Sequence, residues 1–180
     1  MKGNKLIILT VSLFLILTSA CNSLGDDNNT VDYTKLKAGN DAYFVNMKDS
    51  VGYVLYNVPA EQGGGSFYYK ITTPGIQTGG SPAYNDYVVV NYRGKLIDGY
   101  VFDQTYSGAS PLNNSTATPA KFMASRLITG WTLNLMQMKA GEIRTVILPQ
   151  ELAYGASGVS AISPYSTLRF DIQLVSFGVN

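Results

Sequence analysis

The amino-acid sequence predicts an α+β domain in which an antiparallel sheet of five or six strands packs against one short helix. Apolar and β-branched runs separated by Gly, Pro and Asn clusters are typical of strands joined by turns. Beyond the first third of the chain, only one segment places apolar residues at helical spacing. The 13 tyrosines also favour half-buried strands, and a length of 180 residues suits one core with a tail.

Residues 1–20 have the pattern of an export signal. Lys2 and Lys5 precede the apolar run LIILTVSLFLILTSA, which is short for a membrane span. Cys21 follows small residues, and this junction resembles the lipobox of bacterial lipoproteins, although Thr18 stands where that pattern has leucine. We expect a signal peptide over 1–20 and lipidation of Cys21. A secreted protein with an incidental cysteine, or an uncleaved anchor, are the alternatives.

The composition excludes several function classes. The chain has no histidine, and its single cysteine is the expected lipid site. Cysteine nucleophiles, Ser–His pairs and histidine metal sites are therefore excluded, and we expect neither a metal nor a cofactor. The net charge of +1 falls to −1 without the two N-terminal lysines, so nothing suggests a nucleic-acid partner.

Residues 21–64 are predicted to be a lipid-anchored tether and N-terminal extension. The polar, Gly/Asn/Asp-rich stretch 22–40 has the composition of a flexible linker. Residues 41–58 begin with apolar residues near helical spacing, which predicts a short helix. The loop EQGGGS (61–66) then leads into the folded domain, expected over 65–180.

The elements of this domain follow in order along the chain. The helix is expected where Ile128, Trp131, Leu135 and Met138 follow spacings of three, four and three. The last strand is predicted from strict alternation. Strands are expected over 66–73, 87–96, 101–106, 121–124, 142–149 and 167–177, the helix over 127–138, and long loops over 107–120 and 150–166.

Four segments in this order resemble the FKBP-type peptidyl-prolyl isomerases. They are VVVNYRGKLIDGYVFDQTY, LITGWTLNLMQMKAGEIRTVILP, LAYGASG and ISPYSTLRFDIQLV, which together cover about residues 85–175. The resemblance implies an antiparallel half-barrel sheet wrapped over the short helix, with a hydrophobic pocket between the two. It also implies prolyl isomerase activity on proline-containing segments.

The same resemblance implies the site residues. Trp131 is the expected pocket floor, Tyr154 the phenol that donates to substrate, and the backbone N–H of Ile162 the partner of a substrate carbonyl. The expected catalytic residues are Tyr92, Phe102, Asp103, Trp131, Tyr154 and Phe170, and the expected substrate-binding residues are Phe122, Leu127, Ile128 and Ile162.

Each of these residues also has a structural interpretation. Phe102, Leu127, Ile128 and Phe170 taken singly are more often core residues. Placing the Asp103 carboxylate beside an apolar wall costs free energy unless it is hydrogen-bonded. We expect it to accept a hydrogen bond from Tyr92 without moving a proton. The coincidence of all these residues in one family pattern favours the pocket.

The sequence departs from the family pattern in two loops that flank the expected pocket mouth. Val159, Ser160 and Ala161 replace larger side chains, and 106–120 is longer than in compact relatives. Substrate preference and macrolide binding are expected to differ accordingly.

The predicted function is a prolyl isomerase anchored by lipid in the bacterial cell envelope, which assists the folding of exported proteins. Two alternatives are kept: a non-catalytic chaperone or Pro-peptide-binding module using the same cleft, and a glycan-binding surface lipoprotein exploiting exposed tyrosines. Residues 22–64 have the potential to dimerise, but nothing in them requires it.

Overall fold

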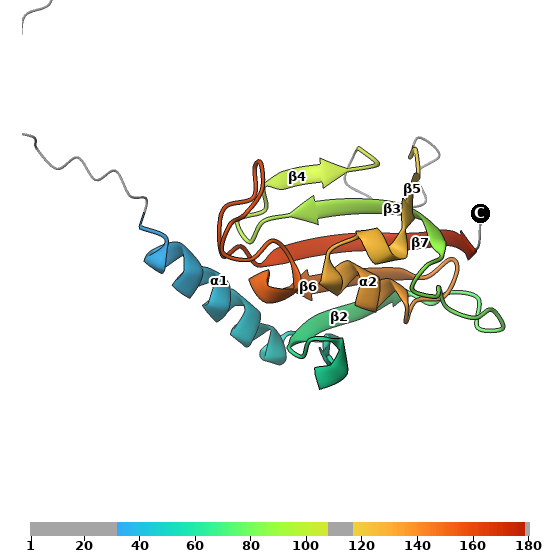
Figure 1. Ribbon diagram of the computed structural model, residues 1–180, viewed down its shortest axis with the longest axis horizontal. Helices are drawn as coiled ribbons and strands as arrows, with labels where there is room; N and C mark the ends of the chain where they lie inside the picture. Colours follow the sequence, from blue (N-terminus) through green and yellow to red (C-terminus); the bar gives the residue numbers. More distant parts are fainter. Residues whose placement is uncertain (1–31, 108–116, 179–180) are drawn as a thin grey trace, which may run out of the picture. The chain divides into compact units, whose positions relative to one another are not determined.

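The computed structural model describes residues 32–107 and 117–178 (Figure 1). The predicted signal peptide and Cys21 lie outside these residues. No helix in the described part of the chain is long and apolar enough to cross a bilayer. The helices and strands are α1 (Thr34–Asn46), β1 (Val54–Asn57), β2 (Ser66–Thr73), β3 (Tyr87–Lys95), β4 (Val101–Gln104), β5 (Ala120–Met123), α2 (Thr129–Leu135), β6 (Ile143–Leu148) and β7 (Leu168–Gly178).

The strands form one antiparallel sheet in the order β1-β2-β6-β7-β3-β4. β5 also pairs with β3, at the opposite end from β4: Val88 lies opposite Phe122, and Gly94 lies opposite Asp103. Both short strands therefore occupy the edge of β3 that β7 leaves free. The predicted α+β fold is confirmed, with seven strands in place of the five or six expected.

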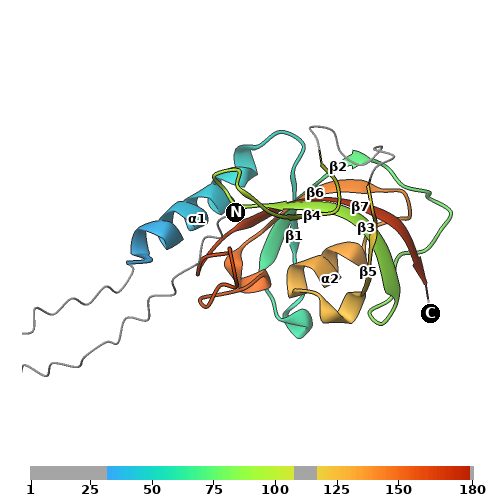
Figure 2. The same ribbon diagram turned by 90° about the horizontal axis from the view of Figure 1, so that it is seen from above.

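The sheet curves around α2, as Figure 2 shows. β7 alternates as predicted, and its buried residues face the helix: Leu168, Phe170, Ile172 and Leu174. Six of the seven residues of α2 are buried, from Gly130 to Leu135. Because an alternating strand offers one apolar face and a short helix cannot fold alone, the main core forms between these two layers.

The opposite face of the sheet carries a second, smaller cluster. Tyr68 of β2 and Ile147 of β6 pack there with Met47, and Phe44 of α1 contacts Tyr68 at a ring-centroid distance of 5.1 Å. The neighbouring residue Phe67 points to the main core instead. Because successive side chains of a strand point to opposite faces, α1 packs on one face of the sheet and α2 on the other.

The N-terminal extension differs from its prediction. The helix occupies Thr34–Asn46, so part of the stretch expected to be a flexible linker is helical, and the expected helix over 41–58 gives way to β1. β1 pairs with β2 across the connection 58–65, so Ser66 of the expected loop belongs to β2. The domain start predicted at residue 65 therefore falls inside a hairpin of the sheet.

Candidate functional site

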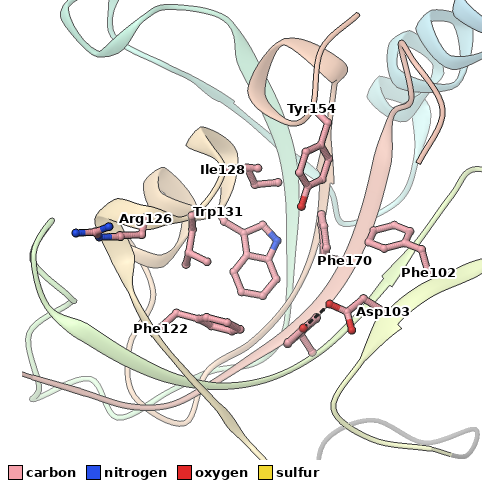
Figure 3. A pocket seen from close by; sticks show the side chains of 10 residues that line it. Phe102, Asp103, Phe122, Arg126, Ile128, Trp131, Tyr154 and Phe170 are labelled. Carbon is pink, nitrogen blue, oxygen red and sulfur yellow. Dashed lines mark hydrogen bonds between the residues drawn. The ribbon is translucent and has the colours of Figure 1, made fainter. Parts of the chain in front are cut away.

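A cavity of about 290 Å³ opens between α2 and the concave face of the sheet (Figure 3). Its lining is mainly aromatic and aliphatic, which is typical of a small-molecule or peptide-side-chain site. The lining residues are Tyr92, Phe102, Asp103, Phe122, Arg126, Leu127, Ile128, Trp131, Tyr154 and Phe170. The structure thus brings together nine of the ten site residues that the sequence predicts.

Trp131 forms the floor of this cavity. It lies in the first turn of α2 and is 4% exposed. Three rings meet the indole at nearly right angles: Tyr92 at 5.1 Å, Phe170 at 5.2 Å and Phe122 at 6.4 Å between centroids. Edge-to-face contacts of this kind fix the orientation of the indole, which lines the cavity. The buried indole Nε1–H has no hydrogen-bond partner among the described residues.

A glycine on β3 makes room for one wall. A Cβ atom at Gly94 would lie 2.5 Å from the Phe102 ring and 2.8 Å from the Phe170 ring. The absence of that atom lets the two rings pack edge to face over the strand, with centroids 5.6 Å apart. Gly94 therefore positions two walls of the cavity without lining it.

The polar side of the cavity is a pair of residues from β3 and β4. The Tyr92 hydroxyl donates to Asp103 Oδ2 at 2.6 Å, as the sequence led us to expect. Asp103 is exposed, however, so its carboxylate keeps contact with water and carries little burial cost. Burial, and then the bond to Asp103, raise the pKa of the Tyr92 phenol, which stays protonated and donates.

Tyr154 reaches the cavity from the loop before β7. It follows the 3-10 turn Gln150–Leu152 and is 37% exposed. Burial and the charge of Asp103 raise the pKa of this phenol as well. At neutral pH Tyr154 is therefore a hydroxyl donor at the mouth of the pocket.

The expected role of Ile162 is not supported by its position. Its backbone N–H donates to the carbonyl of Val159 at 2.8 Å, and Val159 N–H donates to the carbonyl of Ile162 at 2.9 Å. The Ile162 side chain belongs to the core and does not line the cavity. This N–H is already used inside the tight turn at 159–162, where Ser160 adopts φ 47°. Val159, Ser160 and Ala161 likewise do not line the cavity.

The described residues contain no group of three His, Cys, Asp or Glu side chains that could hold a metal ion. The cavity offers rings, two phenols, one carboxylate and one guanidinium. Such a set can bind an apolar ring and orient a carbonyl by hydrogen bonding.

Comparison with known proteins identifies this arrangement. Residues 79–175, which include every residue that lines the cavity, match the family described as FKBP-type peptidyl-prolyl cis-trans isomerase. The chain belongs to the FKBP family. The fold and family predicted from the sequence motifs are thereby confirmed.

Several FKBP relatives resemble the chain. FkpA of Escherichia coli (strain K12) is 41% identical over 107 residues, which are 59% of this chain and 36% of the relative. The "Outer membrane protein MIP" of Legionella longbeachae is 39% identical over 141 residues, 78% of this chain and 53% of that protein. The chain therefore matches between about a third and a half of the length of these two relatives.

Two solved structures superpose on the fold. The crystal structure of FkpA from Escherichia coli has a TM-score of 0.65 at 33% identity, covering 81% of this chain and 62% of that one. The structure of a peptidyl-prolyl cis-trans isomerase from Pseudomonas syringae pv. tomato has a TM-score of 0.64 at 27% identity, covering 81% of this chain and 96% of that one.

The FKBP-type pocket contains one residue that the sequence analysis missed. Arg126 ends the 3-10 turn η3 (Ala124–Arg126) and lines the cavity beside Leu127 and Ile128. Its position directly before two expected pocket residues is the only signal in the sequence. An exposed arginine is usually a surface residue, so that signal is weak.

Proposed function

We propose that the chain is a peptidyl-prolyl cis-trans isomerase that accelerates rotation about X-Pro bonds. The observation that supports this most directly is the apolar cavity of about 290 Å³ over Trp131. It has the dimensions of a site for one small ring, and its lining residues come from six separated segments of the chain. Family membership supports the same reaction.

The reaction requires no proton transfer. The planar amide is held by resonance, with a barrier of about 18–20 kcal/mol, and the twisted amide has lost that charge separation. A less polar group is favoured in a drier environment, so the walls Tyr92, Phe102, Phe170 and the floor Trp131 stabilise the twisted form over the planar one. Moving from tens of seconds to milliseconds requires about 6–7 kcal/mol of barrier reduction.

Hydrogen bonds hold the substrate while the amide turns. In the proposed complex the prolyl ring lies over Trp131, and the Tyr154 hydroxyl donates to a substrate carbonyl. The exposed carboxylate of Asp103 orients Tyr92 and faces the twisting amide. Since the Ile162 N–H is occupied, we propose Ile128 as the backbone donor: it lines the cavity, and its N–H makes no hydrogen bond to the described part of the chain.

We further propose that the protein is a lipoprotein of the bacterial cell envelope that assists the folding of exported proteins. The signal-like residues 1–20 and Cys21 support an anchor, and one relative is named an outer membrane protein. Metabolic labelling with a radioactive fatty acid tests the anchor. Label should appear on the wild-type chain and be lost in Cys21→Ala, and labelling of the variant would rule out Cys21.

The second candidate function is a non-catalytic chaperone that holds Pro-containing segments in the same cleft. A protease-coupled peptide assay with purified residues 22–180 separates the two. A rate above the uncatalysed exchange supports the isomerase. Suppression of aggregation of a refolding client, without any rate enhancement, supports the chaperone and contradicts the isomerase.

A further inference from the structure

Arg126 is a charge at the pocket mouth that the isomerase mechanism does not use. Among the ten lining residues only Asp103 and Arg126 are charged. Asp103 accepts the Tyr92 hydroxyl, whereas Arg126 is exposed and forms no ion pair with any described residue.

The two charges lie on opposite sides of Trp131 (Figure 3). Asp103 and Tyr92 mark the side of the cavity where the proposed function places the rotating amide. If the prolyl ring lies over Trp131, the chain after proline leaves on the other side, past Ile128 and toward Arg126. The first two residues after proline span about 7 Å in extended form, which is within reach of an arginine side chain.

A second cavity adjoins this exit. It has a volume of about 560 Å³, shares Leu127 with the first cavity, and is lined by Glu61 of the turn η2 (Ala60–Gln62) as well as by residues of α2. A substrate that continues beyond Leu127 therefore meets a carboxylate after it has passed the guanidinium. Along this path the positive charge of Arg126 comes first and the negative charge of Glu61 second. An acidic substrate side chain is therefore favoured only at the positions nearest the proline.

We propose that Arg126 is a specificity-determining residue that favours an acidic side chain at the first or second position after the substrate proline. The proposal rests on the isomerase function and names a substrate class for the same site. An exposed ion pair of this kind corresponds to a preference of about two- to fivefold. Because salt screens exposed ion pairs, the preference should shrink when the salt concentration is raised about tenfold, from about 0.05 M to about 0.5 M.

The test is a set of peptides that differ only after proline, Ala-Pro-Glu, Ala-Pro-Gln and Ala-Pro-Lys, each within the same flanking sequence. NMR exchange spectroscopy measures isomerisation without a coupling protease, so the residue after proline can be varied freely. The full chain is used in detergent micelles. The wild-type protein should give kcat/KM in the order Glu, Gln, Lys, with a Glu-to-Lys ratio of about four to twenty.

Variants assign the preference to Arg126. The ratio should fall toward one in Arg126→Gln, invert in Arg126→Glu and persist in Arg126→Lys. Lys48→Gln makes the same change in net charge at an exposed residue of the turn η1 (Met47–Asp49), away from the cavity, and should keep the wild-type ratio. An unchanged ratio in Arg126→Gln, or an equal loss in Lys48→Gln, overturns the proposal.

The outcome separates this proposal from the isomerase function. If the wild-type chain accelerates no peptide, the isomerase proposal fails. The charge preference is then measured from binding: Trp131 fluorescence gives the Kd of each peptide, and the Glu peptide should bind more tightly than the Lys peptide. If all peptides are accelerated equally, the isomerase stands and the role of Arg126 is refuted.

Discussion

At the scale of single residues, the bond between Tyr92 and Asp103 connects the apolar wall to the one carboxylate among the described residues that line the cavity. Both partners come from neighbouring strands, β3 and β4, so their separation is set by the sheet. In the proposed reaction, a rigid pair of this kind would present a fixed dipole to the substrate and would need no reorganisation as the amide twists.

Asp103→Leu should lower kcat/KM on an X-Pro peptide by about 10- to 100-fold, the value of a hydrogen bond to a charged group. The free energy of unfolding should change by less than about 1 kcal/mol, because Asp103 is exposed. Asp103→Asn keeps an acceptor without the charge, so its kcat/KM should lie between the values of the wild type and of Asp103→Leu. Peptide kinetics and urea unfolding on the same samples measure both effects. Unchanged kinetics in Asp103→Leu would remove this residue from the mechanism.

The raised pKa of Tyr92 predicts a loss of stability at alkaline pH. Above about pH 10 the unfolded chain releases its phenolic protons while folded Tyr92 retains its own, so the unfolded state binds fewer protons and stability falls as pH rises. Tyr92→Phe removes this contribution, and its free energy of unfolding should decline less steeply between about pH 9 and 11. The slope should not vanish, because burial also raises the pKa of Tyr154. Parallel curves for wild type and variant contradict the prediction.

At the scale of elements, the close approach of α2 to the sheet depends on a glycine. A Cβ at Gly130 would lie 2.5 Å from Leu148 Cδ2 and 3.0 Å from the Leu152 carbonyl oxygen. Gly130→Ala should therefore cost about 1–3 kcal/mol through overpacking. Gly39→Ala is the matched control, because a Cβ at that helical position in α1 has no atom within 4 Å. This variant should raise the free energy of unfolding by about 0.5–1 kcal/mol. Urea unfolding measures both, and equal effects would refute the packing argument.

Arg144 joins α2 to the sheet at a second point. It lies on β6, is 4% exposed and pairs with Glu142. Its guanidinium donates to Asn134 Oδ1 at 3.2 Å and to the Gln137 carbonyl at 3.0 Å, and it lies 4.5 Å from the Tyr69 ring centroid.

Arg144→Ala should cost about 3–5 kcal/mol of unfolding free energy, because it leaves the Glu142 carboxylate buried without its cation. The double variant Glu142→Gln, Arg144→Met removes both charges and should recover part of that loss. Thermal unfolding followed by circular dichroism provides the comparison. A double variant no more stable than Arg144→Ala would show that the lost bonds to α2, and not the unpaired charge, set the cost.

The elements that the sequence predicts well are those whose apolar period is strong. β7 alternates over its whole buried length and lies within one residue of its expected bounds. The helix expected over 127–138 exists but is shorter, Thr129–Leu135, so Ile128 and Met138 of the predicted spacing lie outside it. α1 was displaced in the prediction because its apolar contacts lie only near its C-terminal end, where Phe44 packs on Tyr68. The one buried residue of the helix is Asn40, and a polar anchor adds nothing to an apolar period.

The candidate site was predictable only as far as side-chain type reveals it. The rings and Asp103 follow a family pattern, whereas Ile162 and Arg126 depend on local geometry. Whether a backbone N–H is free is decided by the turn that closes on it, and the pairing of Val159 with Ile162 leaves no trace in composition. Whether an arginine points to a cavity depends on the turn that carries it.

At the scale of the whole molecule, α1 is joined to the loop that carries Tyr154. Asn40 Oδ1 accepts from the Thr167 N–H at 2.7 Å, and Thr167 Oγ1 donates to the Asn40 carbonyl at 3.2 Å, across 127 residues of sequence. Two residues earlier, the Tyr165 N–H donates to the Gly155 carbonyl at 2.9 Å, beside Tyr154. The helix on the outer face of the sheet therefore supports the rim of the cavity on the inner face.

Asn40→Ala tests this connection, because it leaves the buried Thr167 N–H without an acceptor and should cost about 1–3 kcal/mol. The loss should be local first: amide hydrogen exchange should quicken over residues 153–167, and kcat/KM on an X-Pro peptide should fall as Tyr154 loses its fixed position. Asn46→Ala, at the exposed end of α1, is the control and should stay within about 0.5 kcal/mol of wild type. If Asn40→Ala lowers global stability while exchange over 153–167 keeps its wild-type pattern, α1 stabilises the sheet alone and has no part in positioning Tyr154.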